Sequence, residues 1–234
     1  MATIYTSGKY LEVTQTWHAE DSPWKAAQIW KILAKNYVQP QRIAEIGCGA
    51  GGVLRELSRM DSLSNTHFKG YDISPQAIQL ANRQEAKNIE FYCEDLLSER
   101  NTAYFDVLLA IDVYEHIPDY MGFLVKCKQK AAYKIYHIPL DLHVSSVLRN
   151  AFIGTRYTLG HLHYFTADSA IATLKDTGHK IVDWFYTNPA IDLFKEHPSI
   201  RKGMANVPRY LCSKLSVPLT ARVFGGYSLL VLAK

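Results

Sequence analysis

Residues 42–52 read Arg42-Ile43-Ala44-Glu45-Ile46-Gly47-Cys48-Gly49-Ala50-Gly51-Gly52. The apolar first half is typical of a buried strand, an acid stands at its end, and the glycines predict a tight turn before a helix over Val53–Met60. Glycines let the backbone turn sharply and approach a ligand closely, while the N-terminus of the next helix offers N–H groups and the positive end of a dipole. We therefore expect a ligand to bind at this turn.

The chain is long enough for one well-buried domain, and no stretch of it is typical of a linker. It has 234 residues, of which 48% are hydrophobic and 21% charged, as in ordinary globular proteins. No apolar run approaches the roughly 20 residues that cross a bilayer, the N-terminus lacks a signal-peptide pattern, and the four cysteines form no Cys-x-x-Cys pair. We expect a single cytoplasmic domain over residues 1–234, with no membrane partner and with reduced thiols. The sequence indicates no oligomeric state.

From about residue 42 onward, expected strands alternate with expected helices. The strands are predicted over residues 43–46, 68–72, 89–93, 105–111, 133–138, 181–186 and 227–232. Because the run 105–111 is almost continuously apolar, it should be a central strand that is covered on both faces. The alternation predicts an α/β fold with a doubly wound, mostly parallel, seven-stranded sheet.

Three segments fall outside this alternation. The inserts 141–165 and 188–222 follow strands, so we expect them to cover the ligand crevice that lies at the carboxyl ends of strands in such a sheet. The N-terminal segment 1–40 should be helical and should pack across the same edge. Its aromatic residues before the expected helix are Tyr5, Tyr10 and Trp17, and its expected core-facing helical stripe is Trp24, Ala27, Ile29, Trp30 and Leu33.

The net charge of +4 hides an uneven distribution. Residues 40–120 contain seven Lys or Arg and thirteen Asp or Glu, so the region of the glycine turn is acidic and suits a cationic ligand better than a pyrophosphate. Positive charge gathers in the tail at Lys195, Arg201, Lys202, Arg209, Lys214 and Arg222. An anionic substrate or a nucleic acid could use this tail, but an ordinary solvated surface explains it as well, and a nucleic-acid partner is not favoured.

Four motifs in chain order resemble those of class I S-adenosylmethionine-dependent methyltransferases. They are Glu-Ile-Gly-Cys-Gly-Ala-Gly at 45–51, Asp72, Asp95 with Leu96, and Ile-Asp-Val-Tyr-Glu-His at 111–116. The resemblance covers about residues 25–187 and the final strand, and it is closest in kind to small-molecule enzymes of the ubiquinone-biosynthesis O-methyltransferase type. It implies a Rossmann-like fold with a reversed last strand, S-adenosylmethionine as cofactor, and methyl transfer to an oxygen or nitrogen of a small molecule.

The resemblance also implies which residues bind the cofactor. They are Glu45, Gly47, Cys48, Gly49, Asp72, Ile73, Asp95, Leu96 and Asp112. A carboxylate can accept two hydrogen bonds from a vicinal diol, so Asp72 fits a ribose, although it could instead be a loop or cap acid. Asp95 could accept from an adenine amino group or merely cap a turn at Leu96. Glu45 needs a cationic or donor partner to offset its burial, and a methionine ammonium would supply one.

Two other functional interpretations stay open at this point. Gly47, Gly49 and Gly52 also satisfy Gly-x-Gly-x-x-Gly, and with Asp72 they fit an NAD(P)-dependent dehydrogenase, although Glu45 would then place negative charge near a pyrophosphate. The basic tail leaves room for an RNA-directed methyltransferase, or for a non-catalytic module that binds RNA or protein.

Histidines are the candidate catalytic bases, because methyl transfer to a hydroxyl or ammonium requires loss of a proton. His161 and His163 lie just before an expected helix at the end of the first insert, and His116 follows the fourth strand. The pair His161 and His163 could equally be packing residues at a helix entry. In similar ubiquinone-biosynthesis enzymes an acid, an acid and a His at the spacing of Asp112, Glu115 and His116 bind magnesium, but Asp112 is shorter than the Glu found there, and we expect no metal.

Overall fold

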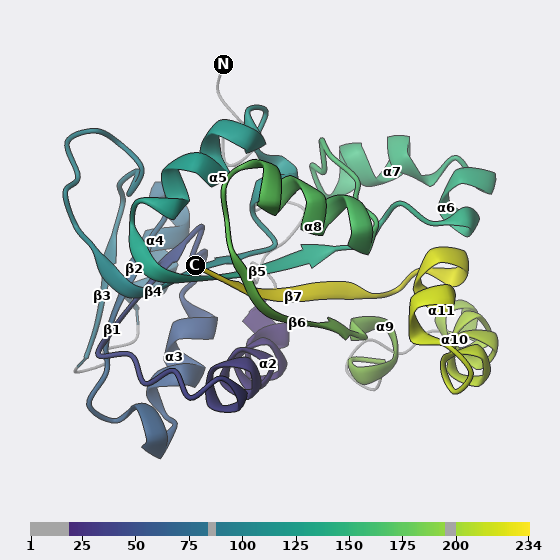
Figure 1. Cartoon of the computed structure of the whole chain (residues 1–234), viewed down its shortest axis with the longest axis horizontal. Coiled ribbons are helices and arrows are strands. Elements are labelled where there is room, and N and C mark those ends of the chain that lie inside the picture. Colours follow the sequence, from purple (N-terminus) through teal and green to yellow (C-terminus); the bar gives the residue numbers. More distant parts are fainter. Residues whose placement is uncertain (1–18, 84–87, 195–199) are drawn as a thin grey trace.

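The computed structural model describes residues 19–83, 88–194 and 200–234, and it is built around one seven-stranded sheet (Figure 1). The strands are Arg42–Ile46 (β1), His67–Tyr71 (β2), Ile89–Tyr92 (β3), Phe105–Ile111 (β4), Ala131–Pro139 (β5), Ile181–Thr187 (β6) and Ser228–Ala233 (β7). Their order is β3-β2-β1-β4-β5-β7-β6, and β7 is antiparallel to both β5 and β6. The predicted doubly wound sheet with a reversed last strand is therefore confirmed.

The order of the strands fixes where a ligand can bind. β1 lies between β2 and β4, and β4 pairs in parallel with both β1 and β5, so β4 is the central strand that its apolar run predicted. Chain connections leave β1 and β4 in opposite directions across the sheet. In an open α/β sheet the crevice at this switch point, beyond the carboxyl ends of the strands, is the usual ligand site.

Helices cover both faces of the sheet. They are Ser22–Lys35 (α2), Gly52–Ser58 (α3), Pro75–Ala81 (α4), Tyr120–Lys128 (α5), Val144–Leu148 (α6), Ala151–Thr158 (α7), Ala167–Asp176 (α8), Pro189–Asp192 (α9), Ile200–Ser213 (α10) and Val217–Phe224 (α11). α2 and α3 pack on one face, and α5 and α8 on the other (Figure 1). Each face therefore has its own buried apolar cluster.

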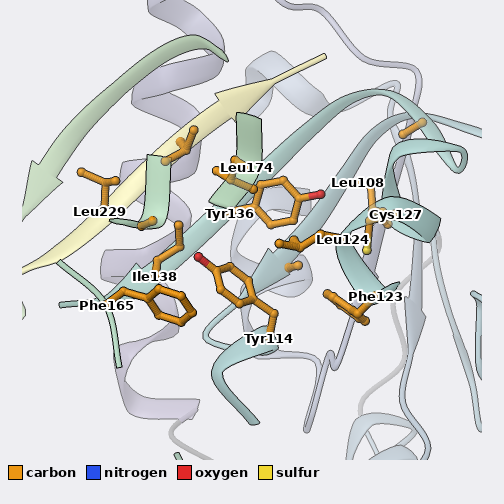
Figure 2. Close-up of a cluster of buried hydrophobic side chains, with 14 of the residues drawn as sticks. Leu108, Tyr114, Phe123, Leu124, Cys127, Tyr136, Ile138, Phe165, Leu174 and Leu229 are labelled. Atoms are coloured by element: carbon orange, nitrogen blue, oxygen red, sulfur yellow. The ribbon is translucent and has the colours of Figure 1, made fainter. Parts of the chain in front are cut away.

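The cluster under α5 and α8 is rich in aromatic side chains (Figure 2). Tyr114 is fully buried, with its ring centroid 5.2 Å from that of Phe165 and 6.2 Å from that of Tyr136. Edge-on contacts of this kind stabilise a core by about 0.5–1.5 kcal/mol each beyond the burial of apolar area. This packing holds the segment after β4 and the end of the first insert against the same layer, which fixes the position of both relative to the crevice.

The predicted stripe of α2 is partly wrong. The buried face of the helix contains Ala26, Ile29 and Leu33, spaced at three and four residues, whereas Ala27 is exposed. Trp24 lies off this face and lines the crevice instead, with its indole Nε1–H donating to Asp192 Oδ2 at 3.1 Å. The aromatic residues placed before the helix, Tyr5, Tyr10 and Trp17, lie outside the described residues.

Both inserts are helical. Insert 141–165 contains α6 and α7, and insert 188–222 contains α9, α10 and all but the last two residues of α11. These helices gather at one end of the molecule, beyond β6 and β7 (Figure 1). In the described part of the chain, no helix combines the length and apolar character that crossing a bilayer requires.

Candidate active site

A cavity of about 740 Å³ opens at the carboxyl ends of β1, β2, β4 and β5. It lies at the switch point, and its volume is within the range of small-molecule sites. Parts of both inserts line it: Asp141, Leu159 and His161 from the first, and Pro189, Ala190 and Leu193 from the second. Residues of both inserts therefore line the crevice, and a role of the inserts as a substrate cover stays a prediction.

The glycine turn after β1 forms one wall of this cavity. Gly47, Gly49 and Gly51 have φ of 68°, 53° and 75°, a region that favours glycine. A Cβ added to Gly51 would lie 2.3 Å from the ring of Phe91, so the position also lacks space for a side chain. The N–H of Gly47 donates to the carbonyl of Tyr71 at 2.8 Å, which ties the turn to the end of β2. The turn is thus a rigid, side-chain-free wall, with Cys48 buried behind it.

Glu45 at the end of β1 has an unsatisfied oxygen. Its side chain lines the cavity and is 3% exposed, and its Oε2 has no hydrogen-bond partner among the described residues. Burial raises the pKa of Glu45 to about 8, with Lys25 opposing the rise and Asp72 and Asp112 adding to it. A buried carboxyl of this kind needs a donor or cation, so the cavity has a place for a positively charged ligand group.

Asp72 serves the loop and also faces the cavity. Its Oδ2 accepts from the Gly49 N–H at 3.0 Å and its Oδ1 from the Ser74 N–H at 2.8 Å, so the alternative role as a loop acid is realised. Burial raises its pKa, and these backbone donors oppose the rise. Beside it, Ile73 is half exposed and lines the same wall. Each carboxylate oxygen keeps a second lone pair, so the loop bonds leave Asp72 able to accept from a diol as well.

Asp95 and Leu96 lie at the mouth beyond β3. The Oδ1 of Asp95 accepts from the Leu97 N–H at 2.9 Å, which is the turn cap that the sequence left open as an alternative. Asp95 is exposed and lines the cavity together with the buried Leu96. Both residues thus lie at the edge of the crevice, and their contact with an adenine stays a prediction.

Asp112 is held by two partners that the motif did not predict. Its Oδ2 lies 2.8 Å from Lys25 Nζ and its Oδ1 lies 2.6 Å from His137 Nδ1. His137 Nε2 in turn lies 2.9 Å from the hydroxyl of Thr187. Burial alone would raise the pKa of Asp112, but His137 and Lys25 hold it well below its usual range. Asp112 therefore belongs to a polar network that connects α2 with β5, β6 and the end of β4. Its predicted contact with the cofactor would be made from within this network.

A second group forms around Glu115, His116 and His161. Glu115 is fully buried, burial raises its pKa well above the usual range, and its Oε1 lies 3.7 Å from His116 Nε2. His116 Nδ1 lies 3.1 Å from the carbonyl of Gly160, and burial lowers its pKa to about 4. His161 Nδ1 lies 2.6 Å from Asp141 Oδ2, and the two imidazole centroids are 4.8 Å apart.

This group also contains the best set of candidate metal ligands. Glu115, His116 and His161 each offer one ligand atom, and these atoms lie within 4.8 Å of one another. Asp112, which the sequence grouped with Glu115 and His116, is not part of this set because its carboxylate is bound to Lys25 and His137.

His163 lies apart from the cavity. Its Nε2 is 3.0 Å from the carbonyl of Ile117, and its ring packs 4.4 Å from the ring of Tyr120. Of the three predicted bases, the structure thus brings His116 and His161 together and leaves His163 in a packing position. A catalytic role for His163 stays a prediction without geometric support.

The walls of the cavity are strongly acidic. Among the described residues that line it, nine are acids and two are lysines, Lys25 and Lys126. The acids are Asp21, Glu45, Asp72, Glu94, Asp95, Asp112, Glu115, Asp119 and Asp141. Such walls attract cations and repel phosphates.

Comparison with known proteins agrees with this geometry. The sequence model of the family described as "Methyltransferase domain" matches residues 19–184, which is most of the chain. The chain is a class I S-adenosylmethionine-dependent methyltransferase. Its cofactor is S-adenosylmethionine, and this identity removes the dehydrogenase alternative. The methyltransferase is 24% identical over 189 residues to a ubiquinone biosynthesis O-methyltransferase of Ralstonia nicotianae, covering 73% of this chain and 77% of the relative.

Two further matches show how far the likeness extends. A ubiquinone biosynthesis O-methyltransferase of Paraburkholderia phymatum is 32% identical over 137 residues, which is 56% of the methyltransferase but only 57% of that relative. Magnesium protoporphyrin IX methyltransferase of Synechocystis, solved with S-adenosylhomocysteine, superimposes with a TM-score of 0.59 at 16% identity, covering 100% of this chain and 89% of the other. At that identity the superposition shows a shared fold.

Proposed function

We propose that the enzyme transfers a methyl group from S-adenosylmethionine to an oxygen or nitrogen of a small-molecule acceptor, with His161 as the base that removes the acceptor proton. The observation that carries this proposal is the pair of His161 and Asp141 in the cavity wall, with Nδ1 and Oδ2 2.6 Å apart. A carboxylate on one ring nitrogen fixes the tautomer and leaves the other nitrogen to accept a proton.

The unsatisfied Oε2 of Glu45 and the bare glycine wall support a fit of S-adenosylmethionine to this cavity. Glu45 would hold the ammonium group, with Gly47, Cys48 and Gly49 as the wall beside it. Asp72 and Ile73 would hold the ribose and flank the base, and Asp95 with Leu96 would meet the adenine. Asp112 would act through Lys25, which it keeps close to Glu45. The cofactor supplies an activated methyl group on a sulfonium cation.

Among the groups near His161, the other candidates are poorer bases. Burial lowers the pKa of His116 to about 4, and burial raises the pKa of Glu115, which disfavours the ionised carboxylate that a base would need. His116 and Glu115 can orient an acceptor by hydrogen bonds, while His161 takes the proton.

The acidic walls favour a neutral or cationic acceptor over the anionic one that the basic tail suggested. The same walls would repel RNA phosphates, so the cavity offers no support for an RNA-directed enzyme. The names of the relatives, which include ubiquinone biosynthesis O-methyltransferases, agree with a small hydroxylated acceptor.

The test begins with a screen for transfer of a labelled methyl group from S-adenosylmethionine to a library of small hydroxyl and amino compounds. With an acceptor in hand, His161→Gln should lower kcat by about 10²–10⁴-fold, the range of general-base catalysis, and leave the cofactor Kd unchanged. Raising the pH should partly restore the rate of this variant, because the acceptor then loses its proton to water.

His163→Gln is the matched control, since His163 lies in the same segment and outside the cavity. It should retain the wild-type rate. A wild-type rate for His161→Gln, or an equal loss in both variants, would remove the assignment of the base. The absence of labelled product throughout the library would contradict a small-molecule acceptor.

A further inference from the structure

Exposed apolar side chains gather on two stretches, which we call the cover segments: residues 142–159 and 200–224. Of the twenty large apolar side chains exposed in the described part of the chain, thirteen lie on them. They are Leu142, Val144, Val147, Leu148, Ile153, Tyr157, Leu159, Met204, Val207, Tyr210, Leu211, Leu215 and Leu219. Several are almost fully open, with Leu148 81%, Tyr157 82% and Leu215 90% exposed. Exposed apolar side chains that gather on helices packed against one another indicate an interaction site.

The charges on the cover segments all have one sign. Between Asp141 and Asp168 the only Lys, Arg, Asp or Glu residues are Arg149 and Arg156. After Glu196 the sequence contains six Lys or Arg and no acid up to its last residue. Apolar and basic residues without acids are typical of helices that lie in the interface of an anionic membrane.

Among the described residues of the cover segments, the exposed cations are Arg149, Arg156, Lys214 and Arg222, of which Arg222 pairs with Asp168. Arg209 is partly buried and donates to backbone carbonyls. The exposed cations thus lie on the same helices and loops as the open apolar side chains, which is where lipid phosphates would meet them.

The two cover segments form one end of the molecule. α11 packs against both α6 and α10, and all of these helices lie together beyond the ends of β5 and β6 and the start of β7 (Figure 1). Leu159 belongs to a cover segment and also lines the cavity. The apolar end and the mouth of the active site are therefore adjacent.

We propose that the cover segments bind the surface of an anionic lipid bilayer, with the apolar side chains in the headgroup region and Arg149, Arg156 and Lys214 on lipid phosphates. A second copy of the chain is a poorer occupant, because its identical face would oppose like charges with no acid to pair with them. A nucleic acid would use the cations and leave the apolar side chains in water. Lying on a bilayer in this way requires no helix that spans it.

The test measures binding of the full chain to phosphatidylcholine vesicles with and without phosphatidylglycerol, by co-sedimentation. We expect binding to the anionic vesicles that weakens as salt is added. The triple variant R149Q/R156Q/K214Q should bind roughly a hundred-fold more weakly, from the contribution of three basic residues near a lipid surface. The variant L148S/Y157S/L215S should bind more weakly at every salt concentration.

Matched controls change residues of the same kind elsewhere on the surface. R42Q/K175Q/K180Q removes three exposed cations, Y37S/Y104S removes two exposed aromatic side chains, and both should bind like the wild type. All four variants alter exposed side chains, and circular dichroism melting curves identify any that fail to fold.

Four outcomes would overturn the proposal. One is wild-type protein that ignores anionic vesicles, and another is vesicle binding that both cover-segment variants retain. The third is a concentration-dependent dimer without lipid that L148S/Y157S/L215S abolishes, which would assign the surface to a second copy. Stronger binding to RNA than to vesicles, unaffected by L148S/Y157S/L215S, would likewise replace the bilayer by a nucleic acid.

Discussion

Glu45→Gln should make the unliganded protein more stable while it weakens binding of the cofactor. Glu45 is almost fully buried, and one of its oxygens has no partner among the described residues. Such a group is an energetic cost to the folded state whenever the unfolded chain would ionise it. Gln keeps the shape of the side chain and removes the ionisation.

The magnitude follows from the pKa of Glu45, which burial raises from 4.5 to about 8. Between these two values the folded protein holds a proton that the unfolded chain has lost, so stability falls as the pH rises. The slope is about 1.4 kcal/mol per pH unit, and it flattens above the folded pKa. At pH 7 the accumulated loss in the free energy of unfolding is about 3 kcal/mol, and Glu45→Gln removes this loss.

Urea unfolding of both proteins from about pH 5 to about pH 9 measures this effect. The amide of Gln has its own cost of burial, but that cost does not change with pH, so the difference between the two curves isolates the carboxyl. Saturating S-adenosylhomocysteine, whose ammonium we place at Glu45, should flatten the pH dependence of the wild type and stabilise Glu45→Gln far less.

Parallel stability profiles for wild type and Glu45→Gln would refute the reasoning, because they would mean that Glu45 does not titrate between its unfolded and folded pKa values. Equal stabilisation of both proteins by S-adenosylhomocysteine would leave the buried carboxyl in place but remove its role toward the ammonium.

Three shorter predictions concern the walls of the cavity. Gly51→Ala should lose about 1–3 kcal/mol in urea unfolding, because the new Cβ would collide with the Phe91 ring at a φ of 75°, whereas Gly154→Ala, with open space around it, should not. Asp72→Ala should lose about 1–3 kcal/mol of stability with its backbone hydrogen bonds and should greatly weaken S-adenosylhomocysteine binding by calorimetry; unchanged affinity would remove its ribose role. Lys25→Met should cost about 1–3 kcal/mol, and adding Asp112→Asn should recover part of that loss in a double-mutant cycle; additive losses would mean that the ion pair is not coupled.

Local patterns predicted the sheet well. The apolar run 105–111 identified the central strand, and the glycine turn after Glu45 identified the strand beside it, because both signals depend on neighbouring residues alone. The buried face of α2 was less predictable from the sequence. Trp24 and Ala27 are apolar, so the pattern alone could not show that they lie outside that face.

The site was predicted only where it depends on a single motif. Lys25 carries no local signal, being one lysine on an amphipathic helix, yet it neutralises Asp112 across the crevice. Asp141 was known only as the start of an insert, and folding alone makes it the partner of His161. His161 and His163 are equivalent in sequence, and only the path of the chain past Ile117 separates a cavity residue from a packing one.

Buried acids and exposed basic residues contribute differently to the net charge of this protein. Burial raises the pKa of Glu45 to about 8, so this acid holds a proton at neutral pH, and burial also raises the pKa of Glu115. By contrast, Arg149, Arg156 and Lys214 on the cover segments are exposed. The unliganded protein is therefore more positive at pH 7 than its formal +4. Because a bound ammonium would ionise Glu45, binding of the cofactor should release a proton into solution, and calorimetry in buffers of different ionisation enthalpy would detect it.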